Sequence, residues 1–145
     1  MAAYAQRRGF DLSSAAPEEM LAFMDGALWS PSTSAQRREQ IMASAAQDQV
    51  LLTPEERAAV EASLAGFDLR PHLSMITAPT LVISGRADGL NPPEAGYELA
   101  QGIPGAHFQV YEESGHMLTA EEQDRLITDV LTFAGDRDEA PDADR

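Results

Sequence analysis

The fold of this chain is decided by the stretch Pro79-Thr80-Leu81-Val82-Ile83-Ser84-Gly85-Arg86-Ala87-Asp88. Its centre is a β-branched, apolar run without polar alternation, which predicts a parallel strand that is covered on both faces. Gly85 ends the strand, and a polar loop that carries Asp88 follows. In an open parallel sheet the working residues lie on the loops at the carboxyl ends of the strands, so this loop is a candidate site.

A helix and a second strand follow this loop. The pattern predicts a helix over residues 93–100, a turn at Ile103-Pro104-Gly105 and a strand over His107-Phe108-Gln109-Val110-Tyr111. Together these elements form a βαβ unit with parallel strands. We expect a last helix to begin at a capping box made by Thr119 and Glu122. Its predicted inward stripe comprises Leu126, Ile127, Val130, Leu131 and Phe133.

The part of the chain before the first strand has a different pattern. Apolar residues recur at helical spacing from Pro17 to about Phe67, which predicts three short amphipathic helices. The first two are separated at Trp29-Ser30-Pro31-Ser32, because proline disfavours helical geometry in the residue before it. Thr53 and Glu56 form a capping box at the start of the third helix, and Gly66 ends it. We interpret Trp29 as an anchor between this segment and the rest of the chain.

The chain therefore divides into three segments. Residues 1–67 are a helical segment, residues 68–134 form the α/β portion, and residues 135–145 are an acidic stretch without an apolar period. Such a stretch cannot bury enough apolar surface to fold, so we expect it to be a disordered tail. The whole chain of 145 residues, 43% of them hydrophobic, has the size and composition of one modest globular domain.

Charge and composition exclude several classes of function. The formal charge is −14, from 24 acidic residues against 10 basic ones, all of them arginine. Binding to a phosphate backbone or to an anionic membrane surface needs clustered cations, so we expect neither nucleic acid nor a membrane as partner. No run approaches the roughly 20 apolar residues of a membrane span. The absence of cysteine excludes disulfides, a thiolate nucleophile and cysteine-based metal sites.

The beginning of the sequence also bears on localisation. The residues Arg7-Arg8-Gly9-Phe10 have the two arginines of a twin-arginine export signal. The apolar region that such a signal requires does not follow, because the next residues include Ser13-Ser14-Ala15-Ala16-Pro17-Glu18-Glu19. We therefore expect a soluble, cytoplasmic protein.

Two polar loops carry the residues that could perform chemistry. Asp88 follows the first strand, and His116 closes the loop Glu112-Glu113-Ser114-Gly115-His116 after the second. A carboxylate that accepts the Nδ1 proton of an imidazole fixes its tautomer and leaves Nε2 as a general base. The residues alone leave other interpretations open, because an aspartate after a glycine turn can cap its loop and a Gly-His pair can be a turn.

The order of these motifs resembles the C-terminal portion of an α/β-hydrolase, from the exit of the lid to the last helix. The resemblance is carried by Asp68-Leu69-Arg70-Pro71-His72-Leu73, Ile76-Thr77-Ala78-Pro79 with the strand and loop that end at Asp88, Asn91-Pro92-Pro93-Glu94-Ala95, Ile103-Pro104-Gly105-Ala106 and Ser114-Gly115-His116. It implies a partial α/β-hydrolase fold in which the helical segment before Asp68 is the lid.

The same resemblance implies a function and roles for two residues. In that family the chain order of the triad is serine, acid and histidine, so Asp88 stands at the acid position and His116 at the base position. The implied reaction is hydrolysis of an ester, amide or related acyl bond in a small-molecule substrate. No cofactor is implied.

The nucleophile of that family is absent from the sequence. It lies in a Gly-x-Ser-x-Gly motif, whose glycines permit a strained turn between a strand and a helix. None of the ten serines has glycine at both flanking positions, and Ser84 and Ser114 each have a single glycine directly after them. An aspartate nucleophile at Asp68 fails as well, because Arg70 stands where the second glycine is needed. Whether this chain is itself an enzyme is therefore left open.

Several hypotheses remain beside a catalytic one. The chain is a truncated gene product, a fragment or one subunit of a split enzyme, or it is a non-catalytic interaction module. Two parallel strands leave an open sheet edge, so we expect a homo- or hetero-oligomer that covers this edge. We expect no metal site, because His72, His107 and His116 lie on a turn, a strand and a loop without the close ligand spacing of zinc sites.

Overall fold

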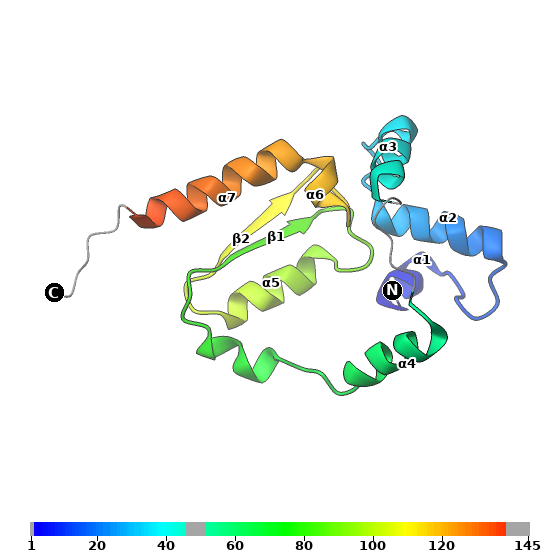
Figure 1. Cartoon of the computed structure of the whole chain (residues 1–145), viewed down its shortest axis with the longest axis horizontal. Helices are drawn as coiled ribbons and strands as arrows, with labels where there is room; N and C mark the ends of the chain where they lie inside the picture. The colour runs from blue at the N-terminus through cyan, green and yellow to red at the C-terminus, as the bar shows by residue number, and fades with distance from the viewer. Residues whose placement is uncertain (1, 46–51, 139–145) are drawn as a thin grey trace.

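The computed structural model describes residues 2–45 and 52–138 (Figure 1). The N-terminal part consists of helices α1 (Ala2–Arg8), α2 (Pro17–Leu28), α3 (Ala35–Ala45) and α4 (Pro54–Ser63), followed by a short 3-10 helix (Arg70–Met75). The C-terminal part consists of β1 (Leu81–Gly85), α5 (Pro93–Gly102), β2 (His107–Tyr111), α6 (Leu118–Glu121) and α7 (Gln123–Asp138).

The two strands form the centre of the α/β portion. They pair in parallel, in a register that runs from Leu81 opposite His107 to Gly85 opposite Tyr111. Helix α5 covers one face of this sheet, where Tyr97 meets Phe108 edge-on with ring centroids 5.7 Å apart. Helix α7 lies against the other face (Figure 1), where Phe133 contacts the ring of His107. The predicted βαβ unit with parallel strands is thus confirmed.

The predicted burial of β1 on both faces is only partly correct. Val82 and Ser84 are buried on the α5 side, whereas Leu81 and Ile83 are half-buried. The predicted inward stripe of α7 is also only partly correct. Leu126 and Phe133 are half-buried, whereas Ile127, Val130 and Leu131 are 49%, 46% and 66% exposed. Two strands lie only about 5 Å apart, whereas a helix with its side chains is roughly 10 Å wide. So narrow a sheet cannot cover the apolar face of α7.

The helix boundaries confirm one predicted cap and correct the other. At the start of α4 the Glu56 amide donates to Thr53 Oγ1 (3.2 Å) and the Thr53 amide donates to Glu56 Oε2 (2.8 Å). The predicted Thr119–Glu122 box is wrong, since Thr119 lies inside α6 and α7 begins at Gln123. The Glu122 carboxylate instead accepts hydrogen bonds from Ser114 and Arg125. The predicted partner of Glu122 is thus replaced by Ser114 on the loop after β2 and by Arg125 one turn along α7.

Helix α1 was not among the predicted elements. Its seven residues are too few to show a helical period, and an isolated helix of that length is unstable in water. It is held by α2, because the buried Tyr4 donates its hydroxyl proton to the Gly26 carbonyl (2.8 Å) and packs on the ring of Phe23. Contacts distant in sequence therefore stabilise this helix.

The ends of the predicted segments shift slightly. Trp29, which is predicted to anchor the N-terminal helices, is only 4% exposed. Residues 135–138, expected to belong to a disordered tail, are the last turn of α7. Residues 139–145, the rest of the expected tail, lie outside the described residues.

Within the described parts of the chain no helix combines the length and the apolar character needed to cross a bilayer.

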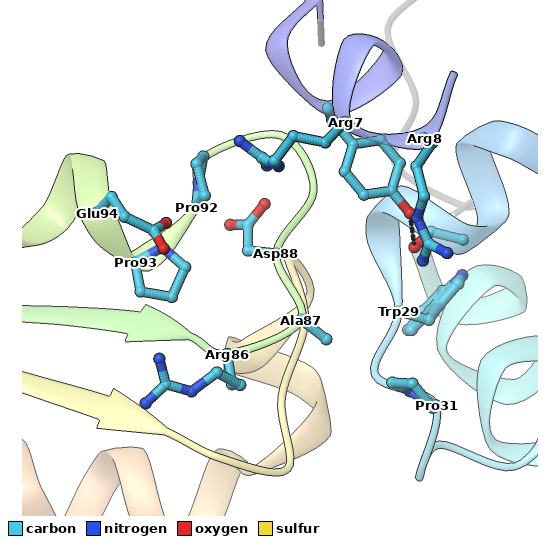
Figure 2. Close-up of a pocket in the computed structure, with 12 residues that line it drawn as sticks. Arg7, Arg8, Trp29, Pro31, Arg86, Ala87, Asp88, Pro92, Pro93 and Glu94 are labelled. Atoms are coloured by element: carbon cyan, nitrogen blue, oxygen red, sulfur yellow. Dashed lines mark hydrogen bonds between the residues drawn. The ribbon is translucent and has the colours of Figure 1, made fainter. Parts of the chain in front are cut away.

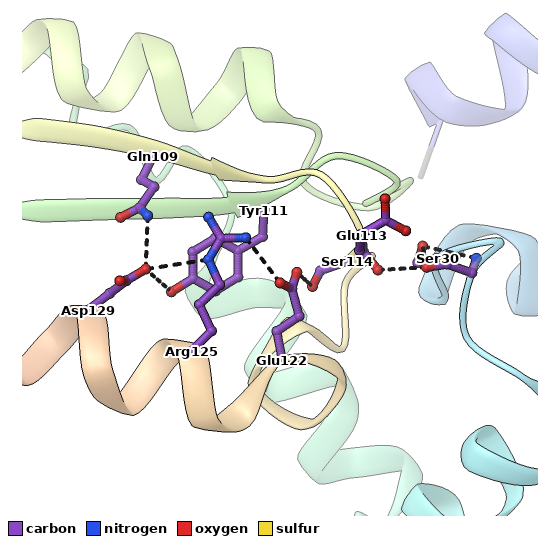
Figure 3. Close-up of polar contacts among 9 residues, drawn as sticks. Ser30, Gln109, Tyr111, Glu113, Ser114, Glu122, Arg125 and Asp129 are labelled. Carbon is purple, nitrogen blue, oxygen red and sulfur yellow. Dashed lines mark hydrogen bonds and ion pairs between the residues drawn. The ribbon is translucent and has the colours of Figure 1, made fainter.

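A polar cluster around the buried Tyr111 joins β2 to α7 (Figure 3). Tyr111 is completely buried and donates its hydroxyl proton to Asp129 (2.7 Å), which also accepts a hydrogen bond from Gln109 (2.8 Å). The guanidinium of Arg125 lies over the Tyr111 ring, 4.0 Å from its centroid. Burial and the neighbouring Asp129 carboxylate raise the pKa of Tyr111 to about 12.

This pKa predicts how the chain behaves in alkali. Folding raises the pKa of Tyr111, so its protonated hydroxyl contributes fully to the free energy of unfolding below pH 10.0. This contribution is lost as the pH rises towards about 12. The chain has three tyrosines and neither lysine nor cysteine, so an ultraviolet titration between these values observes tyrosine alone. We expect the titration to show a late phase above pH 10.0 that Tyr111→Phe abolishes. The absence of this phase from a chain that is still folded by circular dichroism, or its survival in Tyr111→Phe, would contradict this.

Candidate functional site

Asp88 lies on the loop that leaves β1, and both of its carboxylate oxygens are engaged. The residue is only 8% exposed. Its Oδ1 accepts hydrogen bonds from the amides of Leu90 and Asn91, both at 2.8 Å. Asp88 therefore does cap its loop, as one interpretation of the sequence held. Because Oδ1 is fixed in this way, the direction of Oδ2 is fixed as well.

His116 meets that second oxygen. The Nδ1 atom of His116 lies 3.0 Å from Asp88 Oδ2, and the histidine side chain is 33% exposed. The structure thus brings together the two residues that the sequence pattern singled out. A carboxylate at Nδ1 favours the tautomer with the proton on that nitrogen, which leaves the lone pair on Nε2. In the described part of the chain no group is hydrogen-bonded to Nε2, so this nitrogen can accept a proton.

The glycine at the end of β1, Gly85, allows the loops after β1 and β2 to touch. A Cβ atom on Gly85 would lie 2.2 Å from the carbonyl oxygen of Gly115, a distance that no real side chain allows. The Ala87 amide, two residues further on, donates to the Ser114 carbonyl (2.9 Å). The loops are therefore in backbone contact, and this contact sets the separation of Asp88 and His116.

The end of α2 contacts the loops that carry Asp88 and His116, which the sequence analysis did not predict. The Leu28 carbonyl accepts hydrogen bonds from the amides of His116 (2.8 Å) and Met117 (3.3 Å). The preceding carbonyl, that of Ala27, accepts from the Gly89 amide (2.9 Å). One short stretch thus holds the loops of both functional residues. Sequence motifs report side chains, so they carry no signal for contacts made by the backbone.

A pocket of about 320 Å³ opens beside Asp88 (Figure 2). It lies between the β1 loop and the N-terminal helices, with Arg7 and Arg8 of α1 on one side. Trp29 forms part of its wall, whereas His116 does not line it. The pocket therefore reaches the acid but not the base, and the described residues alone do not enclose a reaction site.

Neither serine next to a glycine is placed to act as a nucleophile. Ser84 is buried on the α5 side of the sheet, where a Cβ on Gly96 would collide with its hydroxyl. Ser114 is fully buried, and its hydroxyl donates to Glu122 (Figure 3). In the described residues no serine hydroxyl is hydrogen-bonded to His116. The site thus holds the hydrogen-bonded pair of Asp88 and His116.

The structure does not gather metal ligands. His72 lies in the 3-10 helix and His107 in β2, whereas His116 follows β2. Among residues 2–45 and 52–138 no group of three or more histidine, aspartate or glutamate side chains is arranged to hold a metal ion.

Two parallel strands joined by a crossover helix, with an acid and a histidine on the adjacent loops at their carboxyl ends, define the C-terminal part of an α/β-hydrolase. The profile of a family described as serine aminopeptidase S33 matches residues 21–123, more than half of the chain. The chain belongs to this family of α/β-hydrolases.

Curated relatives match about half of the chain. It is 39% identical over 66 residues to a 2-hydroxy-6-oxononadienedioate/2-hydroxy-6-oxononatrienedioate hydrolase of Klebsiella pneumoniae, a match that covers 46% of this chain and 23% of that protein. It is 35% identical over 72 residues to a pimeloyl-[acyl-carrier protein] methyl ester esterase of Vibrio vulnificus, covering 50% of this chain and 28% of that one. The chain thus matches about a quarter of the length of these relatives.

Solved structures match over more of the chain. A thermophilic esterase from Thermogutta terrifontis superimposes on 92% of this chain and 47% of its own, with a TM-score of 0.63 and 25% identity. The enol-lactonase from Burkholderia xenovorans LB400 superimposes on 82% of this chain and 46% of its own, with a TM-score of 0.59 and 28% identity. At these shares both likenesses extend beyond the α/β portion of residues 68–134.

The glycine contact between the loops can be tested by a single substitution. We expect Gly85→Ala to lower the free energy of unfolding by about 1–3 kcal/mol or more, because the new methyl group would overlap the Gly115 carbonyl. Urea unfolding followed by circular dichroism measures this. Gly135→Ala in α7 is the matched control, since nothing lies within 4 Å of its new methyl group. It should raise stability by about 0.5–1 kcal/mol. Equal stability of Gly85→Ala and the wild-type chain would contradict the contact.

Proposed function

We propose that this chain supplies the acid and the base of a Ser-Asp-His triad that hydrolyses an ester or related acyl bond of a small molecule. The 3.0 Å contact between His116 Nδ1 and Asp88 Oδ2 carries this proposal. The relatives support the ester class, because the names of two of them are methyl ester esterase and esterase. The serine comes from a segment with a Gly-x-Ser-x-Gly motif, which these 145 residues do not contain.

In the proposed reaction His116 moves the proton. Its Nε2 takes the proton of the serine hydroxyl as the oxygen attacks the acyl carbon, and the imidazolium then gives this proton to the leaving alcohol. Water attacks the acyl-enzyme in the same way and releases the acid and the free serine. Asp88 holds the ring in the productive tautomer and stabilises the positive charge that forms on it.

The surface of the chain supports the proposal that further polypeptide completes the site. A sheet of two strands is marginally stable on its own and leaves unpaired edges. Beside it, the aliphatic side chains of Ile127, Val130 and Leu131 on α7 are about half exposed or more. We propose that the segment that brings the serine also covers these surfaces.

A chimera tests the function. The part of the Thermogutta terrifontis esterase that this chain does not match is fused to the chain, and turnover of p-nitrophenyl butyrate is measured. We expect the chimera to be active and the 145-residue chain alone to be inactive. His116→Ala and Asp88→Asn in the chimera should each lower kcat by about 10³-fold or more, because the members of a triad act as a unit.

His72→Ala is the matched control, since this histidine lies on the exposed 3-10 helix and should leave turnover unchanged. Activity of the chimera that survives His116→Ala would overturn the proposed role of this residue. Turnover by the chain alone would show that a nucleophile lies within it.

The same exposed surfaces favour a second candidate, a docking module without catalysis. The aliphatic side chains of α7 and the unpaired strand edges would then bind a protein partner. The chimera separates the two candidates, because a docking module gives a folded but inactive chimera.

A further inference from the structure

Glu121 joins two segments that are far apart in the sequence. It is the last residue of α6, and its Oε2 accepts a hydrogen bond from the Gly115 amide (2.7 Å), directly before His116. Its Oε1 accepts from the Ser30 amide (2.9 Å) and from the Thr33 hydroxyl (2.5 Å), just after the end of α2. One carboxylate thus clamps the histidine loop to the end of α2.

Both carboxylate oxygens of Glu121 act as hydrogen-bond acceptors. All three are donors, and an ionised carboxylate only accepts, whereas a side-chain amide must donate from one end. Ser30 is 2% exposed and Gly115 is buried, so water cannot readily replace the carboxylate at their amides. These three donors therefore favour a carboxylate over a side-chain amide at position 121.

The clamp acts on the residue next to His116. The His116 amide itself donates to the Leu28 carbonyl, on the same stretch of chain that Glu121 holds through Ser30. The histidine loop is thus fixed to the end of α2 at two successive amides, those of Gly115 and His116. The hydrogen bond between the His116 ring and Asp88 therefore depends on the position of this loop.

We propose that Glu121 is a positioning residue that keeps His116 Nδ1 on the Asp88 carboxylate by clamping the histidine loop to the end of α2. Its importance for hydrolysis rests on the proposed function, but its effect on the ring does not. The neighbouring carboxylates have other tasks. Glu122 binds Ser114 and Arg125, and Glu113 on the same loop is exposed.

The tautomer of His116 measures this role directly. In the ¹⁵N-labelled 145-residue chain at about pH 9, where free histidine is neutral, long-range ¹H–¹⁵N correlations distinguish a proton on Nδ1 from one on Nε2. His116→Gln assigns the signals among the three histidines. We expect the wild-type ring to carry its proton on Nδ1, and Asp88→Asn to abolish this preference as a positive control.

Glu121→Gln should lose the Nδ1–H preference, because its amide end cannot accept from the buried amides of both Gly115 and Ser30. Glu113→Gln removes the same charge from an exposed position and should keep the wild-type tautomer. An unchanged Nδ1–H tautomer in folded Glu121→Gln would overturn the proposal. If that variant does not fold, Thr33→Val decides, since it removes one donor and leaves the carboxylate. A partial loss of the Nδ1–H signal then supports the role, and an unchanged ring overturns it.

The chimera gives a second readout. There, Glu121→Gln should lower kcat by about 10- to 100-fold, since a misplacement of about 1 Å has effects of that order, with KM nearly unchanged. Glu113→Gln should leave both constants as in the parent chimera. An inactive parent chimera would count against the proposed function alone, because the tautomer measurement decides the role of Glu121 by itself.

Discussion

The backbone contact between the loops after β1 and β2 is the constraint on which the site depends. Gly85 lacks the side chain that would keep these loops apart, because a Cβ there would collide with the Gly115 carbonyl oxygen. A Cβ on Gly115 would collide instead with the Leu28 carbonyl oxygen at the end of α2. Because the loops touch, an aspartate on one reaches a histidine on the other at 3.0 Å. The end of α2 closes against both loops through the carbonyls of Ala27 and Leu28. Three segments distant in sequence are thus fixed by main-chain geometry.

Carboxylates that accept several hydrogen bonds connect the elements of this arrangement. The chain carries a formal charge of −14, yet several of its acidic side chains are turned inwards as acceptors rather than spread over the surface. Asp88 binds two amides and an imidazole, Glu121 binds two amides and a hydroxyl, and Asp129 binds a tyrosine and a glutamine. Charged acceptors make stronger hydrogen bonds than neutral ones, so each of them ties elements that the narrow apolar core holds only in part.

The exposed surfaces of the chain and the greater length of its solved relatives both favour the proposal that further polypeptide packs against it. The described part of the chain has a sheet of two strands, and α7 leaves aliphatic side chains in contact with solvent. The solved relatives are about twice as long as the portion that superimposes, as 47% coverage of the Thermogutta terrifontis esterase indicates. An apolar face next to unpaired strand edges is the surface that additional strands and helices would bury. The proposed origin of the nucleophile and the exposure of α7 therefore have one physical explanation.

The sequence by itself determined the local elements and the identity of the acid and the histidine. The β-branched run before Gly85 specified a parallel strand, and the Thr53–Glu56 pair specified a helix start, because each depends on neighbours in the chain. Tertiary structure decided the rest. Glu122 accepts a hydrogen bond from Ser114 instead of capping a helix, and α1 is stabilised by the hydrogen bond from Tyr4 to Gly26. Glu121 accepts hydrogen bonds from Ser30 and Thr33. These contacts join residues whose proximity is created by folding, or they use the backbone, which is the same at every position and leaves no pattern in the sequence.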